Sequence, residues 1–261
     1  MNFLKKATAI LATLYTLLCG GLFFMQEKII FSPGKLPEGY VFRAGEEVEL
    51  EVEDGVFLNS LWLKEPSPKG VILYLHGNRG SNKRCLGQAQ TMAGNGYDIF
   101  MPDYRGFGKS DGVIQSETQL ESDAQKVYDF LKKHYPEEHI VLAGYSLGSG
   151  LAAYLAANNR PRQLVLLAPY LSMVDMKDRI APFLPDFLLK YHLTNDAYLQ
   201  KAGLPITIFH GEADDVIPVE SSRKLKALKP NGIHLVTMNG VGHRGVIFDE
   251  AFRNGIRELL R

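Results

Sequence analysis

Ser146, Asp214 and His243 are the residues whose types and settings could together cleave an acyl bond. Ser146 is the centre of a G-x-S-x-G pattern, Gly144-Tyr145-Ser146-Leu147-Gly148, which follows an apolar run and opens a helical stretch. Flanking glycines suit the tight strand-to-helix turn that presents a nucleophile. A serine hydroxyl needs a base to take its proton, and an imidazole base needs a carboxylate on its other nitrogen. We predict Ser146 as nucleophile, His243 as base and Asp214 as the acid that orients the base.

The positions of the acid and the histidine follow from chain order. Asp214 lies in the stretch 210–218, which follows the next-to-last predicted strand, and His243 ends the stretch 240–243 after the last strand. In a chain ordered serine, acid, histidine, these are the loops where the acid and the histidine are expected. On this basis we choose Asp214 over its neighbour Asp215.

The stretch His76-Gly77-Asn78 follows another apolar run and predicts the loop that helps to bind an oxyanion. In this arrangement one backbone N–H comes from that loop and one from the residue after the nucleophile. We therefore predict the amides of Asn78 and Leu147 as the two donors, which would stabilise the charge on a tetrahedral intermediate. His76 itself is predicted to be structural, shaping the loop by hydrogen bonds.

Short apolar runs separated by helix-length stretches predict an α/β fold with a mostly parallel central sheet and helices on both faces. The predicted strands are Val71–Leu75, Ile99–Met101, Ile140–Ala143, Leu164–Ala168, Ile206–Phe209 and Ile233–Met238. The predicted helices are 82–95, 119–134, 147–159, 219–228 and 247–260. Earlier in the chain, Glu47–Glu53 and Val56–Leu63 flank Asp54-Gly55 and predict an antiparallel hairpin.

Residues 7–25 form an uncharged apolar run of nineteen residues. At about 1.5 Å per residue this nearly spans the roughly 30 Å hydrocarbon core of a bilayer. Lys5 and Lys6 precede the run, whereas Glu27 and Lys28 follow it as a balanced pair. This asymmetry predicts a signal anchor with a cytosolic N-terminus and an extracytoplasmic catalytic domain, which is periplasmic, lumenal or extracellular. A cleaved signal peptide and a buried core helix are the alternatives.

The predicted domain organisation follows from these assignments. Residues 1–6 form the cytosolic N-terminus, 26–44 a linker rich in proline and glycine, and 45–261 the catalytic domain.

Residues 170–203 are longer than a simple crossover needs and predict a small helical cap on this domain. Phe183, Phe187 and Leu188 are its predicted substrate contacts, for an acyl or lipid-like substrate. The alternative is that the apolar side chains of the cap only seal the core.

The stretch Asp103-Tyr104-Arg105-Gly106-Phe107-Gly108-Lys109-Ser110 stands between the oxyanion loop and the serine motif. It completes a series of five motifs, H-G-N, D-Y-R-G-F-G-K-S, G-Y-S-L-G, H-G-x-x-D-x-x-x-P and G-H. From about residue 45 to its end the chain resembles the Bem46-type α/β hydrolases. The resemblance implies the α/β-hydrolase fold and serine hydrolase or esterase chemistry, often behind an N-terminal membrane anchor. The stretch 103–110 is itself predicted to be a structural turn, with Arg105 holding the loop.

Composition limits the other classes of function. The chain has 29 basic and 29 acidic residues, so it has no overall positive field that would favour nucleic acid as a partner. No cluster of Cys, His, Asp and Glu has metal-ligand spacing, and we predict neither a metal nor another cofactor. The predicted partners are a small acyl or lipid-like substrate and the bilayer. The sequence thus predicts a membrane-anchored serine hydrolase of the esterase, lipase or thioesterase type. A serine peptidase of the same fold and a catalytically silent, membrane-tethered scaffold remain as alternatives.

Overall fold

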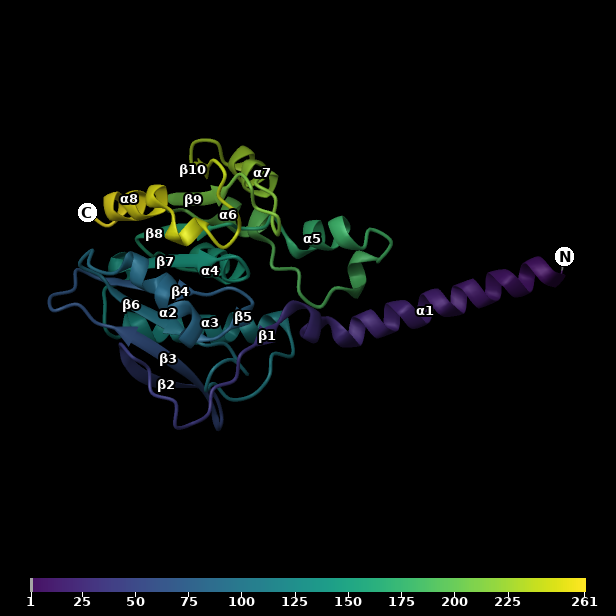
Figure 1. The fold of residues 1–261 in the computed structure, drawn as a ribbon, viewed down its shortest axis with the longest axis horizontal. Helices are drawn as coiled ribbons and strands as arrows, with labels where there is room; N and C mark the ends of the chain where they lie inside the picture. Colours follow the sequence, from purple (N-terminus) through teal and green to yellow (C-terminus); the bar gives the residue numbers. More distant parts are fainter. Residues whose placement is uncertain (1) are drawn as a thin grey trace.

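A twisted eight-stranded sheet is the centre of the computed structural model, which describes residues 2–261 (Figure 1). The strands lie in the order β10-β9-β8-β7-β4-β6-β3-β2. Only β3 runs against its neighbours, β2 and β6, and the other pairings are parallel. The strands are β2 Glu46–Glu53, β3 Val56–Leu63, β4 Val71–Leu75, β6 Asp98–Pro102, β7 Ile140–Tyr145, β8 Gln163–Leu167, β9 Ile206–Gly211 and β10 Ile233–Met238. This is the α/β-hydrolase architecture that the sequence predicts.

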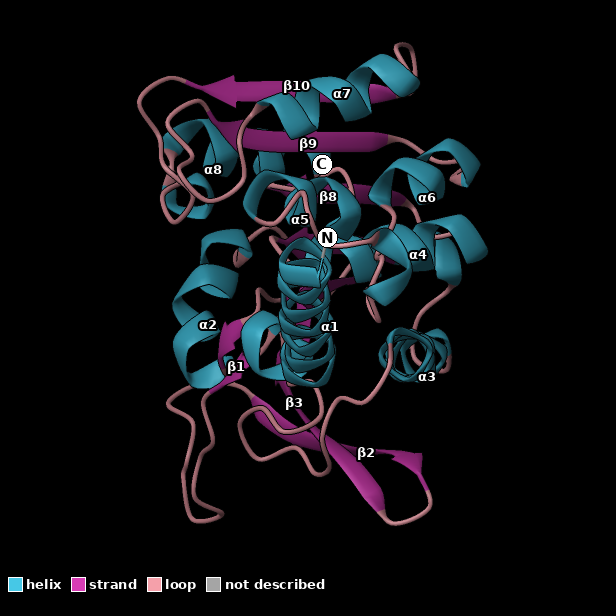
Figure 2. Cartoon of the chain, turned by 90° about the vertical axis from the view of Figure 1, so that its right-hand side faces the viewer, coloured by secondary structure: helices cyan, strands magenta, loops and turns pink. Residues whose placement is uncertain are grey.

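Helices cover both faces of the sheet because its central strands are apolar on both sides. In β4, Val71, Leu73 and Leu75 pack into one hydrophobic cluster, whereas Ile72 and Tyr74 pack into the other. Alternate side chains of a strand point to opposite faces, so each face of the sheet needs its own cover. Figure 2 shows α3, α4 and α6 on one side of the sheet and α2 and α8 on the other.

Five helices of the domain lie within the predicted helical stretches or extend them by a few residues, and α5 and α6 lie in the predicted cap. The helices are α2 Asn82–Ala89, α3 Glu117–Lys132, α4 Gly148–Asn158, α5 Met173–Ile180, α6 Asn195–Lys201, α7 Glu220–Leu228 and α8 Glu250–Leu259. Short 3₁₀ turns complete them, η1 Gln90–Met92, η2 Glu137–His139, η3 Asp186–Leu188 and η4 Val246–Phe248. The hydroxyls of Ser116 and Ser172 accept hydrogen bonds from backbone amides at the starts of α3 and α5, which accounts for where these two helices begin.

The N-terminal helix α1, Asn2–Ile30, projects away from the domain and is longer than the predicted anchor (Figure 1). Its charged ends remain helical, because helical hydrogen bonds join backbone groups and do not require apolar side chains. The first residues of the predicted linker 26–44 are therefore the end of this helix. The chain then forms β1, Ser32–Pro33, which pairs with β5, Arg79–Gly80, beside the predicted oxyanion loop. Met1, the first residue of the predicted cytosolic segment, lies outside the described residues.

Helix α1 is long and apolar enough to cross a membrane from Phe3 to Ile30. Only 6% of its most apolar window is buried in the structure, so its side chains are not those of a core helix. The hydroxyls of Thr8, Thr13 and Thr16 donate to the carbonyls four residues earlier. The few polar side chains of the apolar run are thus satisfied within the helix, as a hydrocarbon environment requires.

Candidate active site

Ser146 sits at the turn between β7 and α4 with a backbone φ of +53°. An L-residue in this left-handed region carries strain, which is a feature of the sharp turn that exposes a nucleophile. The two glycines of the motif are needed by close packing. A Cβ at Gly148 would lie 2.1 Å from the Leu75 carbonyl oxygen, and one at Gly144 would lie 2.6 Å from the Gly148 carbonyl oxygen. Both contacts are with backbone atoms, so other residues would displace the turn.

The structure brings Ser146, His243 and Asp214 into one hydrogen-bonded chain. The Ser146 Oγ lies 3.0 Å from the His243 Nε2, and the His243 Nδ1 lies 2.7 Å from the Asp214 Oδ2. All three residues are buried to about nine-tenths. The serine is thus within reach of a base whose second nitrogen faces a carboxylate, as proton transfer from the hydroxyl requires.

The surroundings of Asp214 keep it ionised. The backbone amides of Val216 and Ile217 donate to its Oδ1, at 2.9 and 2.8 Å. Burial favours the protonated form, but hydrogen bonds from His210, His243 and the Ile217 amide outweigh it and hold the pKa of Asp214 well below its usual range. A carboxylate fixed in this way can hold one tautomer of His243 and stabilise its protonated form.

His210 is a residue of the site whose role the sequence analysis missed. Its Nε2 lies 2.8 Å from the Ile217 carbonyl oxygen and 3.2 Å from the Asp214 Oδ2, and its Nδ1 lies 2.6 Å from the Ser222 Oγ. Because a carbonyl only accepts, Nε2 carries a proton and directs it toward the acid as well. The signal in the sequence was the four-residue spacing of His210 and Asp214 within H-G-x-x-D.

Tyr145 is a second missed neighbour of the site. Its hydroxyl donates to the His243 carbonyl at 3.2 Å, and its ring centroid lies 5.3 Å from that of the imidazole. Burial, followed by the charge of Asp214, raises the pKa of Tyr145 to about 12, so the phenol stays neutral. Tyr145 thereby links the serine turn to the loop that carries the base.

The two predicted oxyanion donors have free amides. Neither the Asn78 nor the Leu147 backbone N–H donates a hydrogen bond to any residue within 2–261. The side chain of Asn78 has another use, since its Nδ2 donates to the Ile30 carbonyl at 2.7 Å and holds the end of α1. An oxyanion site needs donors that are unused in this way, and the role of these two amides stays a prediction.

His76 has the contacts of a structural residue, as the sequence predicts. It is fully buried, and its Nδ1 donates to the Gly77 carbonyl at 2.7 Å. Its Nε2 lies 3.2 Å from the Asp103 Oδ1, and its own carbonyl accepts a 2.7 Å hydrogen bond from the Tyr104 hydroxyl. These contacts hold the predicted oxyanion loop against the turn that follows β6.

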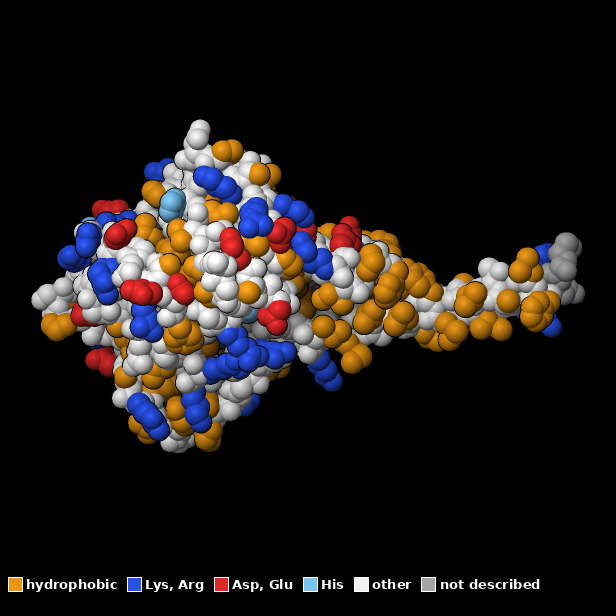
Figure 3. Space-filling view, turned by 45° about the horizontal axis from the view of Figure 1, so that its top comes forward, with side chains coloured by type: hydrophobic (Ala, Val, Ile, Leu, Met, Phe, Trp, Pro, Cys, Tyr) orange, Lys and Arg blue, Asp and Glu red, His pale blue; other side chains and the backbone are white. Residues whose placement is uncertain are grey.

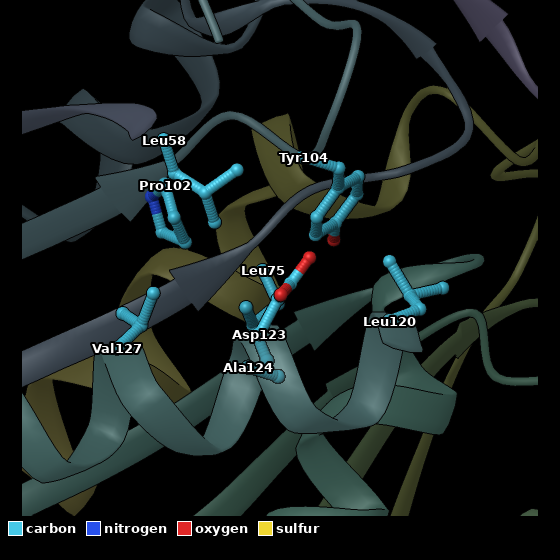
Figure 4. Close-up of a pocket in the computed structure, with 8 residues that line it drawn as sticks. All are labelled: Leu58, Leu75, Pro102, Tyr104, Leu120, Asp123, Ala124 and Val127. Carbon is cyan, nitrogen blue, oxygen red and sulfur yellow. The ribbon is translucent and has the colours of Figure 1, made fainter. Parts of the chain in front are cut away.

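Arg105 anchors that turn to helix α3. Its Nε and Nη2 donate to the two carboxylate oxygens of Asp123 at 2.6 and 2.9 Å, a buried bidentate pair. Figure 4 shows Asp123 reaching toward Tyr104 in a small pocket between β3, β4, β6 and α3. The pocket is lined by Leu58, Leu75, Pro102, Tyr104, Leu120, Asp123, Ala124 and Val127. The turn therefore acts through packing, in agreement with its predicted structural role.

The three predicted substrate contacts of the cap lie away from the core and along α1. Phe183 and Phe187 are 54% and 82% exposed, and Leu188 is half-buried. The carbonyl of Phe183 accepts a hydrogen bond from the Tyr15 hydroxyl, and that of Leu188 accepts one from the Gln26 Nε2. Their role as substrate contacts remains a prediction.

Comparisons with known proteins place this chain in a family. Residues 66–200, slightly more than half of the chain, match the Hydrolase_4 family model, described as serine aminopeptidase, S33. The matched range contains Ser146 and the predicted oxyanion loop and ends before Asp214 and His243.

Relatives with longer alignments support this placement. Protein bem46 of Schizosaccharomyces pombe is 28% identical in an alignment of 272 positions that covers 92% of this chain and 91% of that protein. The lysophosphatidylserine lipase ABHD12 of Danio rerio is 30% identical over 223 residues, which cover 73% of this chain and 58% of that protein. The esterase Pf2001 of Pyrococcus furiosus shares the fold, with a TM-score of 0.70 at 20% identity over 88% of this chain and 97% of that chain. The chain therefore belongs to the Hydrolase_4 family of α/β hydrolases.

Proposed function

We propose that this protein is a membrane-anchored serine hydrolase that cleaves carboxylic ester or thioester bonds of an acyl or lipid-like substrate. The observation that carries the proposal is the continuous hydrogen-bonded chain from the Ser146 Oγ through both nitrogens of His243 to Asp214, with separations of 3.0 and 2.7 Å. Such a chain converts a weak hydroxyl into a nucleophile at neutral pH.

The proposed reaction has two halves. His243 takes the hydroxyl proton as Ser146 attacks the acyl carbonyl, and the amides of Asn78 and Leu147 receive the oxyanion. When the intermediate collapses, His243 returns the proton to the leaving alcohol or thiol, and the acyl group stays on Ser146 as an ester. Water, activated by the same imidazole, then attacks this ester, releases the carboxylic acid and restores the serine.

The apolar helix α1 and the apolar cap support the membrane and lipid parts of the proposal. Helix α1 would anchor the protein with its lysine-preceded end in the cytosol and the catalytic domain outside it. The relative ABHD12 is named as a lysophosphatidylserine lipase, a hydrolase of lipid esters. An ester carried by a membrane lipid would meet both the anchor and the site.

The test is covalent labelling by a fluorophosphonate probe, which reacts with activated serines. Wild-type protein in detergent should be labelled, and Ser146→Ala should not be. Ser149→Ala is the matched control, since Ser149 lies three residues further along in α4 and bonds to Asn195. Unlabelled wild type would favour the silent scaffold, and labelling of Ser146→Ala would remove Ser146 from the proposed mechanism.

A peptidase is the second candidate, because the family model is described as a serine aminopeptidase. Amide and ester cleavage share the same machinery, so the leaving group decides between them. Rates on p-nitrophenyl acyl esters and on aminoacyl p-nitroanilides separate the two activities. Turnover of the anilides alone would favour the peptidase.

A further inference from the structure

One face of α1 is buried against the domain over its last three turns. The larger side chains with reduced exposure on this face are Cys19, Leu22, Phe23, Gln26, Glu27 and Ile30. Their spacing of three or four residues places them on one side of the helix. Nearly all side chains in the first half of α1 are exposed instead, so the domain packs mainly against the half of the helix nearest to it (Figure 1).

The cap contacts α1 through specific hydrogen bonds from Gln26, near the domain, back to Tyr15, near the middle of the helix. At the domain end, the Gln26 Nε2 donates to the Leu188 carbonyl at 2.7 Å, and the Lys190 amide donates to the Gln26 Oε1 at 2.9 Å. Further along, the Tyr15 hydroxyl donates to the Phe183 carbonyl at 2.8 Å. The segment 183–190 therefore runs beside the helix from Gln26 to Tyr15.

These contacts fix how deep the cap lies when α1 spans a bilayer. The uncharged run 7–25 would extend for about 28 Å and has no spare length against a hydrocarbon core of roughly 30 Å. Ten residues separate Tyr15 from Met25, so the Phe183 carbonyl would lie about 15 Å inside the outer boundary of the core. A cap held in this position cannot stay in the water above the membrane.

The surface of the cap suits such a position. Ile180, Phe183 and Phe187 are 79%, 54% and 82% exposed, and Figure 3 shows hydrophobic side chains continuing from α1 onto the part of the domain that it joins. Large side chains of this kind are rarely exposed together on a surface that faces water.

The charges of the cap are neutralised within the protein. Every charged side chain from 175 to 190 is paired, and three acids balance three bases. The pairs are Lys177 with Asp178 and Asp186, Arg179 and Lys224 with Asp175, and Lys190 with Glu27. Ionisable groups within a membrane are tolerated mainly when they are paired in this way.

We propose that the cap segment 180–189 is embedded with α1 in the outer leaflet, where its apolar side chains contact phospholipid acyl chains. This rests on the proposed membrane anchor and deepens the proposed function. The catalytic domain then rests on the bilayer with its cap among the lipids, and an acyl substrate reaches the site from the leaflet without crossing water.

The test places tryptophan on the cap of the full chain, reconstituted in phosphatidylcholine vesicles whose acyl chains carry bromine as a quencher. Trp62 is the single native tryptophan and is buried in the domain, so wild type gives the background. Phe183→Trp adds tryptophan emission to that of wild type, and lipids with bromines near the middle of the acyl chain should quench this added emission. Phe187→Trp, closer to the level of Gln26, should be quenched best by bromines nearer the glycerol.

Leu228→Trp is the control. Leu228 is 46% exposed at the end of α7, just before the chain enters β10. It therefore lies near the N-terminal ends of the parallel strands, whereas Ser146 lies at their C-terminal ends. Its emission should not respond to brominated lipid. Equal quenching of Phe183→Trp and Leu228→Trp, or none of either, would overturn the placement of the cap.

Fluorophosphonate labelling of wild type in the same vesicles keeps the two proposals apart. Quenched cap variants with an unlabelled serine would refute the hydrolase and leave the cap in the membrane. A labelled serine with unquenched cap variants would do the reverse.

Discussion

The strained backbone of Ser146 leads to a prediction about two variants that should lose the same activity and differ in stability. Ser146→Ala and Ser146→Gly both remove the hydroxyl and its 3.0 Å hydrogen bond to His243, so they share that loss. They differ only in the Cβ at a φ of +53°. Comparing the two variants therefore isolates the cost of placing a side chain in the left-handed region.

The size of the difference follows from two opposing terms. A left-handed conformation costs an L-residue roughly 1–2 kcal/mol, and glycine avoids this cost. Glycine also gives the unfolded chain more conformational entropy, which lowers the free energy of unfolding by about 0.4–1 kcal/mol. We expect the glycine variant to be more stable than the alanine variant by about 1 kcal/mol, or about 2 °C in thermal midpoint for a domain of this size.

The assay is thermal unfolding in one detergent at one scan rate, followed by the fluorescence of Trp62. Hydrolysis of a p-nitrophenyl ester is measured on the same samples, and both variants should lose ~10⁶ in turnover, as removal of a triad nucleophile does. An alanine variant that melts at or above the midpoint of the glycine variant would refute the strain at Ser146. Near wild-type turnover in either variant would refute its role as nucleophile.

Two further predictions concern the acid. His210→Phe removes a hydrogen bond to the charged Asp214, commonly worth ~1.5 kcal/mol, so kcat/KM should fall roughly tenfold and the acid limb of its pH profile should move to higher pH. Ser222 contacts only the other ring nitrogen of His210, so Ser222→Ala should change kcat/KM and its acid limb less. An equal loss of kcat/KM in the two variants would count against this role of His210. Since the pKa of Asp214 is lowered by folding, the ionised carboxylate stabilises the protein above the unfolded pKa of about 3.9, and this stability is lost as pH falls toward the folded value. The difference in thermal midpoint between wild type and Asp214→Asn should therefore shrink as the pH falls below about 4, and a difference that persists there would contradict the linkage.

The sequence alone predicted the elements and the residue types of the site. Strand β4 begins and ends where its apolar run does, because a strand buried on both faces needs continuous apolar residues. The glycines at 144 and 148 identified the turn, since only glycine fits where a Cβ would meet backbone oxygens. Local chemistry of this kind is visible in the order of residues along the chain.

Other features depended on the tertiary structure. His210 and Tyr145 lie within sequence motifs, but their contacts with Asp214 and His243 arise only when the folded strands β9 and β7 place them there. The full length of α1 was also missed. Its contact with the cap could not be predicted, because Tyr15 and Phe183 lie 168 positions apart in the sequence. Periodicity reports which face of an element is buried, whereas long-range contacts are set by how the elements pack, and that is decided only when the whole chain folds.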